Sequence, residues 1–147
     1  MAYEIYEHNL HEDRLTIAGI TGMGHQLAVS LSKSLREISP ILVDTIEIHL
    51  NKSDVKSGEI TLSNSPELKN RCVVVVDDVL NTGKTLVYAM QPFLEAGVKK
   101  IEVAVLVNRS HKLYPVTPDY TGLELSTTLS EHISVDLGSE NSSVHLH

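Results

Sequence analysis

Cysteine, long apolar runs and an excess of basic charge are scarce or missing in this sequence. Cys72 is the single cysteine, which excludes an intrachain disulfide and favours a reducing compartment such as the cytosol. No apolar run approaches the roughly 20 residues of a membrane-spanning helix, so we expect no membrane contact. The 12 lysines and arginines stand against 19 acidic residues, giving a formal net charge of -7. This balance argues against a general nucleic-acid-binding surface.

The length of 147 residues suits one domain with a substantial hydrophobic core. We predict a single domain over residues 1–137, followed by a polar tail over residues 138–147 that we expect to fray. The first residues contain neither the basic stretch nor the apolar block of a signal peptide. We therefore predict a cytoplasmic protein.

Residues 72–88 combine a very apolar strand with two acids and a glycine-containing turn. Val73 to Val76 are bulky on both sides of an extended chain, which predicts a central strand of a parallel sheet covered on both faces. Asp77 and Asp78, the acid pair, follow the valines. Because two carboxylates are costly to bury without partners, we interpret the acid pair as functional and not as core.

The turn after the acid pair has the features of a phosphate-binding loop. Its residues, the phosphate loop, are Asn81, Thr82, Gly83, Lys84 and Thr85. Backbone N–H groups in such a turn and at the start of the following helix attract anions, and the threonine hydroxyls donate further hydrogen bonds. A nucleotide P-loop is excluded, because Asp78 stands where that motif requires a glycine. Carboxylates beside a phosphate loop instead suit a sugar phosphate, since they accept hydrogen bonds from vicinal hydroxyls.

A second glycine-rich turn lies between a strand predicted over residues 15–20 and a helix. The residues of this turn, the glycine loop, are Thr21, Gly22, Met23 and Gly24. The helix is indicated by apolar residues at periods of three and four, namely Leu27, Leu31, Leu35 and Ile38. The order of the glycines does not match the dinucleotide-binding fingerprint, so we exclude that function. The loop is still a candidate anion site, because the first N–H groups of a helix are unpaired.

The remaining elements predict a parallel α/β sheet. Further strands are expected over residues 41–50, where apolar and polar residues alternate, and over residues 101–107. The helix after the phosphate loop should be kinked or split by Pro92. Residues 51–70 are irregular, apart from a short pairing around residues 60–62, and loops of this length are usually lids. The order of strands and helices predicts a three-layer fold, in which helices flank a mostly parallel twisted sheet and ligands bind at the carboxyl ends of its strands.

The segment from Val73 to Thr85 resembles the phosphoribosyl-pyrophosphate (PRPP) signature of the type I phosphoribosyltransferases. The resemblance implies that the acid pair holds the ribose hydroxyls and that the phosphate loop holds the 5′-phosphate. It also implies that the glycine loop binds pyrophosphate, with Met23 where the family usually has arginine. A flexible lid closes over the sugar in that family, and Lys52 stands where similar members of the family have an arginine. Lys52 therefore joins the acid pair as a predicted catalytic residue.

Residues 108–137 are similar to the tail of the bifunctional pyrimidine-operon attenuator and uracil phosphoribosyltransferase proteins. The shared features are an Asn-Arg-x-His-Lys run from residue 108 and a Pro-Asp-Tyr-x-Gly run from residue 118. The resemblance implies a small hood after the last core strand, whose base-contacting residues are Val107, Asn108, Arg109 and His111. RNA is a less favoured partner, because Thr117 and Leu123 stand where the family is often basic.

The resemblance as a whole implies a phosphoribosyltransferase that binds Mg-PRPP, transfers phosphoribose to a nucleobase, with uracil favoured, and releases pyrophosphate. Mg²⁺ would arrive with PRPP, and Asp77 or Asp78 is the candidate protein ligand. Relatives are usually dimers or larger, so we expect a homodimer or a higher homo-oligomer. The alternative left open is a PRPP- or nucleotide-binding regulator with weakened catalysis, acting on pyrimidine genes through RNA.

Overall fold

The computed structural model describes residues 1–147 apart from 57, 65, 110, 126–132, 139–141 and 147. In chain order its elements are α1 (Ala2–His8), β1 (Arg14–Ile20), α2 (Met23–Ile38), β2 (Leu42–His49), β3 (Thr61–Leu62), β4 (Cys72–Leu80), α3 (Lys84–Ala89), α4 (Gln91–Ala96), β5 (Lys100–Asn108), β6 (Tyr120–Glu124), β7 (Ile133–Leu137) and β8 (Ser142–Leu146).

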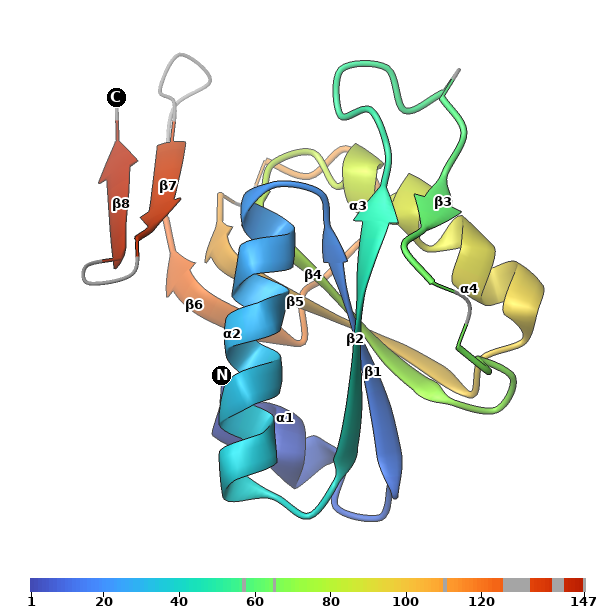
Figure 1. Cartoon of the computed structure of the whole chain (residues 1–147). Helices are drawn as coiled ribbons and strands as arrows, with labels where there is room; N and C mark the ends of the chain where they lie inside the picture. The colour runs from blue at the N-terminus through green and yellow to red at the C-terminus, as the bar shows by residue number, and fades with distance from the viewer. Residues whose placement is uncertain (57, 65, 110, 126–132, 139–141, 147) are drawn as a thin grey trace.

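A six-stranded sheet with the strand order β3-β2-β1-β4-β5-β6 forms the centre of the molecule (Figure 1). Strands β1, β2, β4, β5 and β6 run parallel to one another, and β3 pairs antiparallel with β2. Helices α1 and α2 pack on one face of the sheet, and α3 and α4 pack on the other. The predicted three-layer α/β fold with a mostly parallel sheet is confirmed.

The valines of β4 contribute to the hydrophobic cores on both faces of the sheet. Val73 and Val75 pack under α3 and α4, whereas Val74 and Val76 pack under α1 and α2. All four are 0% exposed, and burying one valine side chain stabilises a fold by about 1.5–3 kcal/mol. The prediction of a central strand covered on both faces is confirmed. Cys72, the first residue of the strand, is buried as well.

Strand β4 is longer than the valine pattern predicts. It continues through the acid pair to Leu80, because Val79 and Leu80 pair with Val107 and Asn108 of β5. The acid pair is therefore held by a regular strand and not by a loop.

Helix α2 packs very closely against β1 at the end that carries the glycine loop. The predicted apolar stripe is buried at Leu27, Leu31 and Leu35. A Cβ atom on Gly19 would lie 2.5 Å from the Cα of His25 in the first turn of α2. Only a residue without a side chain allows this approach, which brings the start of α2 to the carboxyl end of β1.

Pro92 divides the helical segment after the phosphate loop, as predicted. Helix α3 ends at Ala89 and α4 begins at Gln91, with the proline in the first turn of α4, where its missing N–H needs no partner. Gly97 ends α4 with a φ of 71°. No helix within the described ranges is long and apolar enough to cross a membrane.

Three strands near the carboxyl terminus, β6, β7 and β8, were not predicted. Tyr120–Glu124 forms β6, which pairs with the edge of β5. The prediction of a frayed tail was wrong for Ser142–Leu146, which forms β8 and pairs antiparallel with β7, while residues 139–141 and 147 lie outside the described residues. Backbone hydrogen bonds between β7 and β8 order this polar segment, which has few apolar residues to bury. In Figure 1 these strands form a separate two-stranded sheet beside the main one, and β7 packs against α2 and also contacts β4.

Candidate active site

The acid pair binds Lys52, which lies in the lid segment, residues 51–70. Asp77 is 3% exposed, and Asp78 is half-buried beside it. Lys52 Nζ donates hydrogen bonds to Asp77 Oδ1 at 2.9 Å and to Asp78 Oδ1 at 3.3 Å. The Asp78 backbone N–H donates to Asp77 Oδ1 at 2.9 Å. The three residues predicted to be catalytic are therefore brought together, although Lys52 lies far from the acid pair in the sequence.

The two carboxylates of the pair have opposite electrostatic properties. Burial raises the pKa of Asp77 to about 7, against the opposing attraction of Lys52. Burial also acts to raise the pKa of Asp78, but its hydrogen bond with Asp77 and the charge of Lys52 hold that pKa below its usual range. Burial acts to lower the pKa of Lys52, and the two carboxylates outweigh it and raise this pKa. Near neutral pH a proton therefore resides on Asp77 in preference to Asp78.

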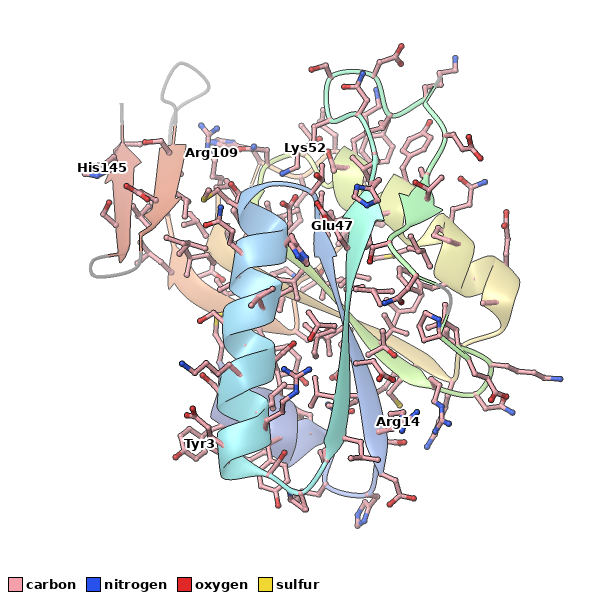
Figure 2. The ribbon with its side chains drawn as sticks, in the orientation of Figure 1. Tyr3, Arg14, Glu47, Lys52, Arg109 and His145 are labelled. Carbon is pink, nitrogen blue, oxygen red and sulfur yellow. The ribbon has the colours of Figure 1, made fainter. Side chains whose placement is uncertain are left out.

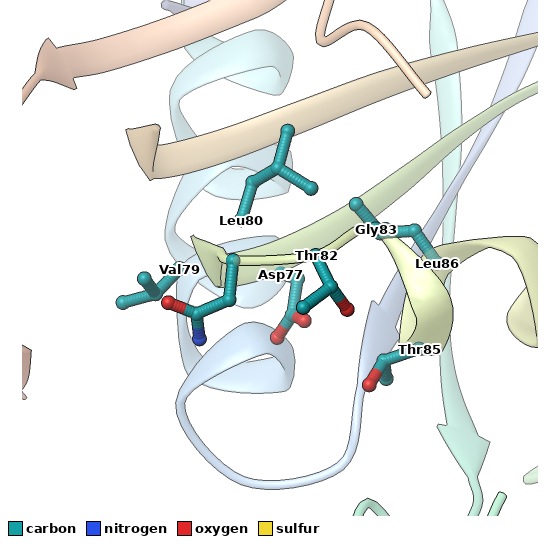
Figure 3. Close-up of a pocket in the computed structure, with 8 residues that line it drawn as sticks. Asp77, Val79, Leu80, Thr82, Gly83, Thr85 and Leu86 are labelled. Atoms are coloured by element: carbon teal, nitrogen blue, oxygen red, sulfur yellow. The ribbon is translucent and has the colours of Figure 1, made fainter. Parts of the chain in front are cut away.

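The phosphate loop forms a small pocket immediately after the acid pair. The pocket has a volume of about 40 Å³, the size of a few water molecules and suited to one phosphate group. Its lining residues are Asp77, Val79, Leu80, Asn81, Thr82, Gly83, Thr85 and Leu86. Figure 3 shows the Asp77 carboxylate and the Thr82 and Thr85 hydroxyls on the same side of the loop. Carboxylate acceptors and hydroxyl donors thus meet in one hollow.

Local geometry explains why the phosphate loop is compact. Gly83 has a φ of 89°, a conformation that glycine adopts without a steric penalty, and α3 begins directly after it. The carbonyl of Thr82 accepts hydrogen bonds from the N–H groups of Leu113 at 2.9 Å and Tyr114 at 3.0 Å. The segment after β5 therefore folds back over the phosphate loop. Lys84 is exposed at the start of α3.

The glycine loop lies directly beside the acid pair. A Cβ atom on Gly24 would lie 2.9 Å from the carbonyl oxygen of Val76 and 3.1 Å from Asp77 Oδ1. Gly22 has a φ of 89°, and α2 begins at Met23. The acid pair therefore has the glycine loop on one side and the phosphate loop on the other. This arrangement of two candidate anion sites around two carboxylates matches the expectation from the sequence.

A glutamate that sequence reasoning missed holds the glycine loop in place. Thr21 Oγ1 donates a hydrogen bond of 2.9 Å to Glu47 Oε1 on β2. The same carboxylate oxygen lies 3.8 Å from Nδ1 of His49. The alternation of apolar and polar residues over residues 41–50 predicts only that Glu47 and His49 lie on the wetter face of that strand. Their position at the carboxyl end of β2, next to β1, is the signal that predicts proximity to the glycine loop.

The predicted hood residues divide into two groups. Val107 and Asn108 are buried in β5, and the Asn108 side-chain amide donates to Glu124 Oε1 at 3.3 Å. Arg109 Nη1 instead donates to Asn81 Oδ1 of the phosphate loop at 2.9 Å. His111 is partly exposed. Figure 2 places Lys52, which contacts the acid pair, and Arg109, which contacts the phosphate loop, at the same end of the molecule.

Within the described residues no group of three or more histidine, cysteine, aspartate or glutamate side chains could hold a metal ion. The acid pair can supply two carboxylates at most. A bound divalent ion would need further oxygen ligands from the molecule that it accompanies.

Comparison with known protein sequences identifies one family. The model of the phosphoribosyl transferase domain matches residues 1–140. The bifunctional protein PyrR of Streptococcus pneumoniae (strain CGSP14) is 35% identical over 140 residues, which cover 93% of this chain and 81% of that protein.

Solved structures agree with the sequence comparison. The purine phosphoribosyltransferase of Pyrococcus horikoshii is 28% identical, with a TM-score of 0.62 over 85% of this chain and 76% of that one. A hypoxanthine-guanine phosphoribosyltransferase of Bacillus anthracis has a TM-score of 0.70 over 84% of this chain and 72% of that one. Its identity of 16% supports the fold alone. The family model and the PyrR relative show that the chain belongs to the phosphoribosyl transferase family, and the geometry of its site agrees with this.

Proposed function

We propose that this protein binds Mg-PRPP and transfers the phosphoribosyl group to a nitrogen of a nucleobase, with release of pyrophosphate. The observation that carries the proposal is the placement of the acid pair between the glycine loop and the phosphate loop. PRPP has the same order of groups, because its ribose hydroxyls lie between a 5′-phosphate and a 1-pyrophosphate. The phosphate loop would take the 5′-phosphate, the acid pair the hydroxyls and the glycine loop the pyrophosphate.

The reaction breaks the bond from the sugar C1 to pyrophosphate, forms a bond from C1 to the base nitrogen, and releases the proton of that nitrogen to solvent or to the departing pyrophosphate. C1 becomes cation-like during the exchange, so catalysis depends on positioning and on stabilising the separating charges. The acid pair would hold the ribose and place negative charge near C1. Met23 contributes no charge to the glycine loop. Stabilisation of the departing pyrophosphate by this loop would therefore come from its backbone N–H groups.

The residues fit a magnesium ion that arrives with the ligand. Mg²⁺ is usually bound by one or two carboxylates together with substrate phosphates, and the acid pair offers that number. Asp77 or Asp78 would hold the ion, which neutralises charge on pyrophosphate when bound.

Uracil is the base that we favour. Support comes from the similarity of residues 108–137 to pyrimidine-operon uracil phosphoribosyltransferases. Purines are the competing bases, since one solved relative is a purine phosphoribosyltransferase. The hood, with Val107, Asn108, Arg109 and His111, would contact the base. The single buried cysteine fits a cytoplasmic protein.

The test is pyrophosphate release from Mg-PRPP with uracil, hypoxanthine, guanine, xanthine, adenine and orotate in parallel. We expect release with uracil, and a loss of about 100-fold or more in Asp78→Asn, because one ribose-binding carboxylate is removed. Release with a purine alone would correct the choice of base. No release with any base would reject the transferase. Calorimetric binding of Mg-PRPP without turnover, together with a salt-sensitive gel shift of pyrimidine-leader RNA, would then favour the regulator.

A further inference from the structure

Lys52 occupies one oxygen of each carboxylate that would hold the proposed sugar. Its Nζ donates to both members of the acid pair, at 2.9 and 3.3 Å. A ribose with free 2- and 3-hydroxyls offers two O–H donors to the same two carboxylates. We propose that Lys52 is a built-in competitor for the ribose hydroxyls, and that ribose binding releases it from the acid pair. This inference rests on the proposed function, because it assumes that the ligand contains a ribose phosphate.

The limited accepting capacity of Asp77 makes the competition direct. Its Oδ1 atom already accepts hydrogen bonds from Lys52 Nζ and from the Asp78 backbone N–H. Each carboxylate oxygen has about two lone-pair sites, so a third donor cannot join Oδ1 without displacing one of these two. The backbone donor is fixed within β4. The lysine side chain is therefore the donor that a ribose hydroxyl would displace from Asp77 Oδ1.

The lid segment is built so that Lys52 can leave without a rearrangement of the backbone. Leu50 and Val55, on either side of it, are 9% and 4% exposed and belong to the hydrophobic core. Between them the Asp54 N–H donates to the carbonyl of Asn51 at 3.1 Å, which closes a turn. The Lys52 side chain itself is 39% exposed. Rotation about its side-chain bonds is sufficient to move the ammonium group from the acid pair into solvent.

The released ammonium group has an anion-binding neighbour. Gly24 of the glycine loop approaches Asp77 so closely that a Cβ atom there would lie 3.1 Å from Asp77 Oδ1. A lysine that leaves Asp77 is therefore within side-chain reach of the proposed pyrophosphate position. Ribose binding would thus supply a cation to that position only after the sugar is in place.

The decisive measurement is the affinity of ribose 5-phosphate for the full chain and for Lys52→Met, by calorimetry in metal-free buffer. We expect Lys52→Met to bind ribose 5-phosphate about three- to tenfold more tightly, the range set by removing the two partly exposed ion pairs of Lys52. The affinity for 2,3-dideoxyribose 5-phosphate, which lacks both hydroxyls, should change by less than about twofold.

Lys56→Met is the matched control. Lys56 belongs to the same lid segment and loses the same charge, but it lies beside α4 in a hollow with Gln91 and Glu95. We expect no gain for either ligand in this variant. Thermal melting of each variant shows that the chain remains folded.

Three outcomes would overturn the inference. Weaker binding of ribose 5-phosphate by Lys52→Met would show that the lysine contacts the bound ligand. An equal change for both ligands would show a general charge effect. Absence of ribose 5-phosphate binding by both proteins would reject the inference together with the ribose site.

The inference and the transferase can fail separately. Pyrophosphate release without the affinity gain rejects the competition alone. If Lys52→Met binds ribose 5-phosphate more tightly but no base supports pyrophosphate release, the transferase function alone is rejected. Lys52 then remains a competitor for ribose hydroxyls in a binding protein.

Discussion

Asp77 combines near-complete burial with a position next to a second carboxylate. Its folded-state pKa of about 7 exceeds its ordinary value of 3.8, so folding favours the protonated form. The stabilisation from this proton is complete below the ordinary pKa and is lost as the pH rises through about 7. At alkaline pH the wild-type chain therefore carries the full cost of a buried charge.

Asp77→Asn should consequently gain stability relative to wild type as the pH rises. Asparagine does not titrate, and one pKa unit corresponds to about 1.4 kcal/mol, so the relative gain between acid and alkaline pH is on the order of 2–4 kcal/mol. Urea denaturation at about pH 4.5 and pH 8 measures it. A stability difference that does not change with pH would contradict this expectation.

Asp78→Asn is the control with the opposite sign. The folded-state pKa of Asp78 lies below its ordinary value, so its ionised form contributes stability above that value and loses it on acidification. This variant should be less stable than wild type at about pH 8, and the deficit should shrink toward acid pH.

The role of a side chain could be predicted where the residues that act together are adjacent in the sequence. The acid pair and the phosphate loop adjoin each other in the chain, so their joint chemistry could be predicted. The contact of Lys52 with the acid pair, and that of Glu47 with Thr21, depend on which strands are neighbours in the sheet. Sequence patterns alone do not define such tertiary contacts.

At the scale of the elements, the contact between α2 and β1 determines where the glycine loop lies. Gly19→Ala would place a methyl group 2.5 Å from the Cα of His25 and 2.7 Å from the Cβ of Ala28. Because backbone cannot yield as a side-chain tip does, we expect a loss of about 1–3 kcal/mol in unfolding free energy. Urea denaturation provides the measurement. Ser30→Ala on the exposed side of α2 should stay within about 0.5 kcal/mol of wild type. A Gly19→Ala variant as stable as this control would show that the two elements can separate.

Elements with a strong local pattern were predicted correctly, and those that depend on a partner were not. The valines of β4 and the break at Pro92 are local signals. Tyr120–Glu124 contains Gly122 and has one buried residue, Tyr120, so its extended state depends on the free edge of β5. Strand β8 likewise depends on β7.

At the scale of the whole molecule, the number of chains in the assembly is an open prediction. We expect a homodimer or larger assembly, because relatives of this family usually associate. Sedimentation velocity should give a mass of at least twice the 16.2 kDa of one chain. A mass of one chain at micromolar concentration would contradict the prediction.

The burial of Cys72 makes this chain convenient for site-specific fluorescence. The thiol is 1% exposed, and burial raises its pKa, so it should react slowly with maleimide reagents. A cysteine introduced as Lys56→Cys would then be the one readily labelled position, on an exposed part of the lid segment. A dye attached there would follow lid rearrangement in real time, in a stopped-flow instrument, without removal of the native cysteine.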